Sequence, residues 1–318
     1  MTATTAKPIC AMLLSATLGF TAFAQQPVAT NPAAGEQAAA PKVQGRREVT
    51  AEQRQKIEAA LPAKAPAKPH KARKLLVVDY RATHPSVPSA DLAVQLMGSK
   101  TGAYEATISH DASLLAADKL QQFDAVYLNN TVGRDGDVFG TPELREGFAA
   151  YIRNGGGLVG NHAASVAAPE WSEFTEILGA TGAAHRSQTE KIFVKVDDPS
   201  SPLNAAFGGK GFEYTGEVFR FKPPSPRTKV HVLLSIDVAK TDMNQDVCTS
   251  NCVSDDGEYP ISWVRSYGKG RVFYMSFGHD ADVFWNAPIL QHFLAGIQFA
   301  LGDLKADARP TVKPAAGK

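Results

Sequence analysis

The stretch Gly155-Gly156-Gly157-Leu158-Val159-Gly160-Asn161-His162 decides the fold of this chain. A helical pattern over 142–154 runs into the three glycines, a short apolar strand follows, and His162 stands at the carboxyl end of that strand. A second histidine, His279, follows another strand pattern at 271–277. Because ligands bind outside the carboxyl ends of the strands in an open α/β sheet, the two imidazoles are predicted to lie at a functional site.

Strand and helix patterns alternate along the chain. Short apolar runs predict strands, and runs with helical periodicity and capping residues predict helices. This alternation predicts an α/β fold with a mostly parallel central sheet, helices on both faces and extra strands in the second half. Gly268-Lys269-Gly270 predicts a hairpin with a three-residue loop. The expected strands are 75–79, 104–108, 124–128, 157–161, 191–196, 217–221, 230–236, 259–267 and 271–277, and the expected helices are 89–97, 112–122, 142–154, 169–178 and 286–301.

The N-terminus has the pattern of a secretory signal peptide over residues 1–24. Lys7 precedes an apolar run, and Ala22-Phe23-Ala24 forms a cleavage site. The apolar run is too short for a membrane span. We therefore expect a periplasmic or secreted protein with no membrane span after the signal is cleaved.

A basic leader is expected between the signal and the folded domain. Residues 42–74 contain ten Lys or Arg against three Glu, although the whole chain of 318 residues has a net charge of only +1. Thr50 and Gln53 form a capping box for a short helix at 49–61. Because the chain has no basic stripe interleaved with aromatic residues, nucleic acid is not an expected partner. The expected segments are a signal peptide at 1–24, a disordered basic linker with one helix at 25–73, a domain at 74–304 and a disordered tail at 305–318.

Two cysteines remain once Cys10 leaves with the signal peptide. They are Cys248 and Cys252, and in an exported chain this pair favours a disulfide that closes a small loop. Two separate thiols are the alternative. A zinc site on this pair is not expected, because two cysteines with no nearby histidine cannot complete a tetrahedron.

Four of the eight histidines stand where a site is expected. His84, His162 and His279 follow predicted strands directly or after a short loop, and His185 lies in a loop between a helix and a strand. An imidazole titrates near neutral pH and also binds metals, so each ring can serve as an acid, a base or a metal ligand. A single histidine in such a position is more often a structural residue whose polar atoms are hydrogen-bonded within the fold. The occurrence of four such histidines indicates a site.

Polar residues accompany these histidines. Glu217 opens a predicted strand and is a candidate partner for an imidazole, either as a base or as an orienting group; a charge at a sheet edge is the alternative. Asn129 and Asn130 end a predicted strand on the same side and are candidates for binding substrate hydroxyls. Other catalytic signatures are missing: no G-x-S-x-G elbow surrounds Ser276, and 155–157 precedes a strand instead of opening a helix after one.

Several stretches make the chain resemble the ThuA-like (trehalose utilisation) domain family, within the class I glutamine amidotransferase-like superfamily. The resemblance extends over about 74–303. The matching stretches are 83–88, with His84; 156–164, Gly-Gly-Leu-Val-Gly-Asn-His-Ala-Ala; 196–202; 217–221, Glu-Val-Phe-Arg-Phe; and 260–279, with His279.

This resemblance implies a flavodoxin-like three-layer sandwich and a link to disaccharide and keto-sugar metabolism. Amidotransferases of the superfamily place a nucleophilic cysteine at the turn after the strand that here ends at Asn161. This chain has His162 there and no cysteine nearby, so glutamine amidotransfer by a thiolate is excluded. Family members often have an aspartate soon after the histidine, where this chain has Ser165 and Val166.

Three functional hypotheses follow. The leading one is an exported enzyme that acts on a sugar by acid–base chemistry, with His162 and His279 as the proton-transferring groups and Glu217, His185 and His84 in support. The second is a metal-dependent sugar hydrolase or lyase that uses the same His84, His162, His185, His279 and Glu217 to hold a divalent cation. The third, which the missing aspartate favours, is a non-catalytic sugar-binding module.

Overall fold

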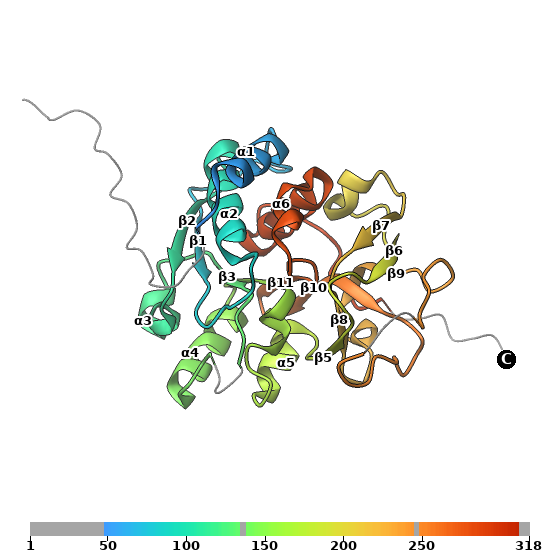
Figure 1. The fold of residues 1–318 in the computed structure, drawn as a ribbon. Helices are drawn as coiled ribbons and strands as arrows, with labels where there is room; N and C mark the ends of the chain where they lie inside the picture. The colour runs from blue at the N-terminus through green and yellow to red at the C-terminus, as the bar shows by residue number, and fades with distance from the viewer. Residues whose placement is uncertain (1–47, 134–137, 245–247, 312–318) are drawn as a thin grey trace, which may run out of the picture. The chain divides into compact units, whose positions relative to one another are not determined.

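The computed structural model describes residues 48–133, 138–244 and 248–311, and the predicted signal peptide lies outside these ranges. A mixed nine-stranded sheet forms the centre of the described part, with the order β2-β1-β3-β4-β11-β10-β9-β6-β7 (Figure 1). The strands from β2 to β11 in this order run parallel, and the rest pair antiparallel. The strands are β1 (Lys74–Val78), β2 (Glu105–Ser109), β3 (Ala125–Asn129), β4 (Gly157–Asn161), β6 (Lys191–Val196), β7 (Phe212–Thr215), β9 (His231–Ile236), β10 (Pro260–Tyr267) and β11 (Gly270–Met275).

Helices cover both faces of this sheet, as predicted (Figure 1). Alternate residues of β1 enter different cores: Leu75 and Val77 join one apolar cluster, and Leu76 and Val78 join the other. The first cluster includes residues of α1 (Ala51–Ala60), α2 (Val87–Thr101) and α6 (Ala287–Leu301), and the second includes residues of α3 (Ala117–Leu120), α4 (Pro142–Arg153) and α5 (Ser172–Leu178). Among the described residues, no helix combines the length and hydropathy needed to cross a bilayer.

The glycine stretch joins α4 to the central strand β4. Gly155 has a φ of 122°, which favours glycine, and its amide donates to the carbonyl of Ile152 at the end of α4. A Cβ added at Gly157 would lie 2.3 Å from the carbonyl oxygen of Ala300, so α6 packs directly on the backbone of β4. The glycines therefore have the architectural role that the sequence indicates, and they deliver His162 to the carboxyl edge of the sheet.

Several elements differ from those expected. β5 (Gly182–His185) and β8 (Phe219–Phe221) form a separate two-stranded antiparallel sheet, and neither β5 nor β7 is predicted from the sequence. The helix expected at 112–122 is a 3₁₀ turn followed by the short α3, because Ala116 between them has an extended ψ of 142°. The β10–β11 hairpin has the two-residue turn Gly268-Lys269 instead of three residues, since Gly270 already belongs to β11.

The predicted linker and tail lie against the domain where they are described. The capping box of α1 between Thr50 and Gln53 forms as expected. Ala67 then exchanges two hydrogen bonds with the side chain of Gln298 in α6. Near the other end, the amide of Thr311 donates to the carbonyl of Val230. These bonds fix backbone groups that a disordered segment would leave to water, so the described parts of the two segments are held by the domain.

The pair of Arg73 and Asp303 anchors the predicted linker, which leads to a stability prediction. The guanidinium donates to both carboxylate oxygens of Asp303, whose side chain is fully buried, and also to Asp124. We expect Asp303→Asn to lower the free energy of unfolding by about 2 kcal/mol, because removing one partner of a buried pair leaves the other charge poorly compensated. This loss is smaller than the roughly 3–5 kcal/mol usual for a broken buried ion pair, because Asp124 still pairs with Arg73 in the variant.

Urea denaturation monitored by circular dichroism measures this loss. The matched control is Glu58→Gln, which breaks the solvent-exposed pair with Arg54 and is expected to cost less than about 0.5 kcal/mol. Equal and small losses in the two variants would show that the segment around Arg73 is held by other contacts.

Candidate functional site

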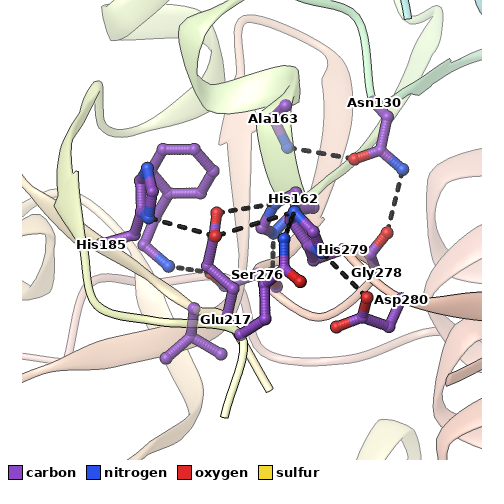
Figure 2. Close-up of polar contacts among 12 residues, drawn as sticks. Asn130, His162, Ala163, His185, Glu217, Ser276, Gly278, His279 and Asp280 are labelled. Carbon is purple, nitrogen blue, oxygen red and sulfur yellow. Dashed lines mark hydrogen bonds and ion pairs between the residues drawn. The ribbon is translucent and has the colours of Figure 1, made fainter. Parts of the chain in front are cut away.

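Five predicted site residues meet at the carboxyl edge of the parallel strands. His162 follows β4, His279 follows β11, and His84 lies in the connection from β1 to α2. His185 ends β5, and Glu217 lies between β7 and β8. Figure 2 shows the carboxylate of Glu217 between His185 on one side and His162 and His279 on the other. The second half of the chain thus completes a site that the parallel strands begin.

Three of the imidazoles pack edge to face. The ring centroids of His84 and His162 are 4.9 Å apart, those of His84 and His279 are 5.1 Å apart, and those of His162 and His279 are 5.4 Å apart. One nitrogen from each ring lies within 4.8 Å of one nitrogen from each of the others. His162 is fully buried and His279 is 8% exposed. The three rings therefore direct ligand atoms into one small volume.

The backbone fixes both the position and the tautomer of His162. Its φ of 45° is unusual for a residue with a side chain, and this bend turns the ring to the sheet edge. Nδ1 lies 2.9 Å from the carbonyl oxygen of Ser276, which can only accept, so Nδ1 carries the proton. Nε2 then holds a lone pair in the neutral ring. It is buried, has no hydrogen-bond partner among the described residues, and lies 3.4 Å from Oε1 of Glu217.

The same arrangement holds His279. Nδ1 lies 3.1 Å from Oδ1 of Asp280, and the carboxylate accepts a hydrogen bond from it. Nε2 lies 3.7 Å from Oε2 of Glu217 and 3.2 Å from the amide nitrogen of Gln188, a donor, so Nε2 also holds a lone pair. A histidine whose Nδ1 donates to an acceptor behind it, with Nε2 directed forward, is the usual arrangement of a metal-binding imidazole.

His185 lies directly beside the carboxylate of Glu217. Nδ1 of His185 lies 3.1 Å from Oε2 of Glu217 and 3.0 Å from the carbonyl oxygen of Arg186, and both are acceptors. This nitrogen therefore carries a proton and orients the carboxylate. Burial alone would raise the pKa of the Glu217 carboxyl, but hydrogen bonding with the neighbouring imidazole of His185 helps to hold that pKa below its ordinary value.

Burial keeps two of the imidazoles uncharged. It lowers the pKa of His84 to about 3, with help from the charges that His162 and His279 would carry. Burial also lowers the pKa of His162, against the opposing effect of Glu217. Nδ1 of His84 is buried and has no hydrogen-bond partner among the described residues. The site therefore combines the ionised carboxylate of Glu217 with the neutral rings of His84 and His162.

The atoms of this set that face one another are acceptors. The lone pairs on Nε2 of His162 and His279 face the carboxylate oxygens of Glu217, and three acceptors that face one another repel. A cation between them would turn that repulsion into attraction. Nε2 of His162 lies 3.4 Å from Oε1 of Glu217 and Nε2 of His279 lies 3.7 Å from Oε2, near the roughly 3.3 Å between ligand atoms of one tetrahedral ion, while the nitrogens of the three rings lie within 4.8 Å of one another. The residues present therefore fit a divalent cation.

Asn129 and Asn130 do not face this volume, which corrects the predicted role in binding hydroxyls. Both are fully buried. The amide nitrogen of Asn129 donates to Asp91 and to the carbonyl of Val87. Asn130 has a φ of 52°, and its amide nitrogen donates to the carbonyl of Gly278, which joins the loop after β3 to the loop that carries His279 (Figure 2). Asn129 thus ties the end of β3 to α2, and Asn130 ties together two loops of the site.

Comparison with known proteins agrees with this architecture. The family model described as ThuA, trehalose utilisation, matches residues 74–300. This chain belongs to the ThuA family. A ThuA-like protein from Bacteroides uniformis ATCC 8492 is 23% identical, with a TM-score of 0.58 over 78% of this chain and 99% of that chain. Another, from Parabacteroides merdae ATCC 43184, is 18% identical, with a TM-score of 0.52 over 76% of this chain and 95% of that chain. Among curated proteins, none matches the sequence.

The likeness to these structures confirms the flavodoxin-like three-layer fold of this ThuA-family chain.

Several groups around the site were not predicted from the sequence. The carbonyl of Ser276 belongs to the backbone and leaves no signal in residue type. Gln188 lies in the connection from β5 to β6 and has no motif around it. Phe219 packs 4.9 Å from the ring of His162 and 5.7 Å from that of His185, centroid to centroid, and its apolar strand position suggests only a core residue.

Proposed function

We propose that this ThuA-family protein is a metal-dependent enzyme that acts on a sugar. The observation that carries the metal is the convergence of His84, His162 and His279 with the carboxylate of Glu217. These four residues would hold the ion. A bound divalent metal supplies Lewis acidity, either to polarise a carbonyl or to lower the pKa of a water molecule.

The other residues of the site have supporting roles. Asp280 and the carbonyl of Ser276 orient the rings of His279 and His162, and burial lowers the pKa of His162 so that this ring stays neutral. His185 has a side chain that is one-third exposed and lies next to Glu217, so it is our candidate for transferring a proton to or from the substrate. The substrate class rests on the family description, trehalose utilisation, which supports a disaccharide or an oxidised sugar.

We also propose that the protein is exported. The N-terminal sequence supports this, and so does the disulfide between Cys248 and Cys252, because disulfides persist in oxidising compartments. A sugar encountered in the periplasm or outside the cell is the partner that this location implies.

The test uses untagged protein purified without chelator. Mass spectrometry of the elements is expected to find about one divalent ion per chain, since one cluster is proposed. Product analysis with disaccharides and their keto derivatives is then expected to show turnover that stops after chelation and returns with the metal. Protein without metal that binds none on addition, yet still converts a sugar, would contradict the proposal.

A metal-free acid–base enzyme is the second candidate, and the contact between His185 and Glu217 favours it. In that case His162 and His279 transfer protons without an ion, and chelation leaves turnover unchanged. A sugar-binding module gives a third outcome: calorimetry detects binding, and product analysis detects no conversion.

A further inference from the structure

A small loop closed by a disulfide lies beside the strand that carries His185. Cys248 and Cys252 are joined, as the sequence favours, and they enclose Thr249, Ser250 and Asn251. The hydroxyl of Ser250 donates to the carbonyl of Ala183 in β5 at 3.0 Å. The loop is far from His185 in sequence, so its contacts with β5 are tertiary contacts.

Thr249 binds both backbone polar groups of His185. The amide of Thr249 donates to the carbonyl of His185 at 3.1 Å, and the amide of His185 donates to the hydroxyl of Thr249, also at 3.1 Å. The same hydroxyl lies 3.2 Å from the carbonyl of His185, to which it can donate. One threonine therefore serves as donor and acceptor to one residue of the site.

This support matters because β5 has little of its own. It contains four residues and pairs only with the short β8, and an isolated two-stranded sheet is marginally stable. The Nδ1–H of His185 orients the carboxylate of Glu217. A shift of β5 therefore moves the donor that aims this carboxylate at His162 and His279.

We propose that Thr249, held in the loop that the Cys248–Cys252 disulfide closes, is a positioning residue for His185 and, through it, for Glu217. The proposal rests on the proposed function in taking Glu217 as part of the working site. The disulfide restricts the loop to the few conformations in which Thr249 can reach β5. Thr249 itself does not touch the cluster, and its role passes through His185.

Two substitutions at Thr249 test the hydroxyl. Thr249→Val keeps the shape and removes the hydroxyl, and it is expected to speed hydrogen exchange of the His185 amide by at least about tenfold, as loss of one net hydrogen bond predicts. It should also shift the Nδ1 resonance of His185 in protein labelled with ¹⁵N-histidine, where His185→Gln provides the assignment. Thr249→Ser keeps the hydroxyl and is expected to restore both signals.

Reduction tests the disulfide in the unaltered protein. A dithiol such as dithiothreitol transfers two electrons and two protons, so the S–S bond becomes two thiols and the reagent becomes its cyclic disulfide. We expect the same increase in exchange at His185, with the amides of β4 unchanged. The double variant Cys248→Ser/Cys252→Ser is the control. Its His185 amide should exchange as fast as in the reduced protein, and adding the reductant should not change that rate.

The results separate this inference from the proposed function. If Thr249→Val and reduction both leave the exchange and the resonance of His185 unchanged, the inference is overturned, whatever the site binds. If both signals change and zinc affinity falls by about tenfold, as for other groups that orient metal ligands, the inference is supported. If both signals change but no form of the protein binds zinc, positioning of His185 stands and the metal proposal fails.

Discussion

Replacement of His162 with asparagine is expected to weaken binding of the divalent cation by at least about 100-fold. The imidazole supplies a buried lone pair that faces Glu217, and loss of a ligand should exceed the 10- to 100-fold cost of losing a group behind a ligand. Asparagine is chosen because it tolerates a positive φ better than most residues, so the bend at position 162 survives. Competition against a chromophoric zinc chelator measures the affinity.

The control is His70→Gln, which removes an exposed imidazole outside the cluster. It is expected to bind zinc as the unaltered protein does. His162→Asn is expected to lose some stability, because it removes the hydrogen bond to Ser276 and the buried ring contact with Phe219, so its fold is checked by circular dichroism. Unchanged zinc affinity in a folded His162→Asn protein would remove this ring from the site.

Replacement of Gly157 with alanine is expected to cost at least about 3 kcal/mol of unfolding free energy. The new methyl would lie 2.3 Å from the carbonyl oxygen of Ala300 and 2.8 Å from Cβ of Ala125, and the first of these is backbone that cannot rotate away. Overpacking of this kind costs about 1–3 kcal/mol, and more where the backbone must shift. For a domain of this size, the melting temperature should fall by roughly 10 °C.

Gly208→Asn is the matched control for the glycine variant. Gly208 has a φ of 56°, and a Cβ there meets nothing within 4 Å, so asparagine should be tolerated with a loss below about 1 kcal/mol. Differential scanning calorimetry compares the two. If the melting temperatures of Gly157→Ala and Gly208→Asn are equal, α6 does not pack on β4 as closely as described.

The parallel half of the fold and its histidines were predictable from local patterns. Apolar strands alternate with capped helices there, and a residue that follows a parallel strand is placed at a known edge of the sheet. His162 and His279 follow β4 and β11, which are neighbours, so their proximity follows from the topology. The pattern does not give the direction of each ring, which depends on the carbonyl of Ser276 and on Asp280.

The rest of the site depends on β5, a strand that the sequence analysis does not predict. β5 and β8 have four and three residues, and only their pairing brings His185 beside Glu217. Asn129 and Asn130 are predicted to face a ligand, and in the structure they bind other parts of the chain. A polar residue at the end of a strand can face a ligand or a neighbouring loop, and residue type does not separate the two. Here the amide of Asn129 donates to α2, and the amide of Asn130 donates to the loop that carries His279.

The central claim is that His84, His162, His279 and Glu217 hold one divalent cation. A crystal structure of the untagged protein grown with zinc, with data collected on both sides of the zinc absorption edge, tests it most directly. One anomalous peak is expected at about 2.0–2.2 Å from nitrogen atoms of the three histidines and an oxygen of Glu217. Full-occupancy zinc elsewhere on the protein, with no anomalous density among these four side chains, would contradict it.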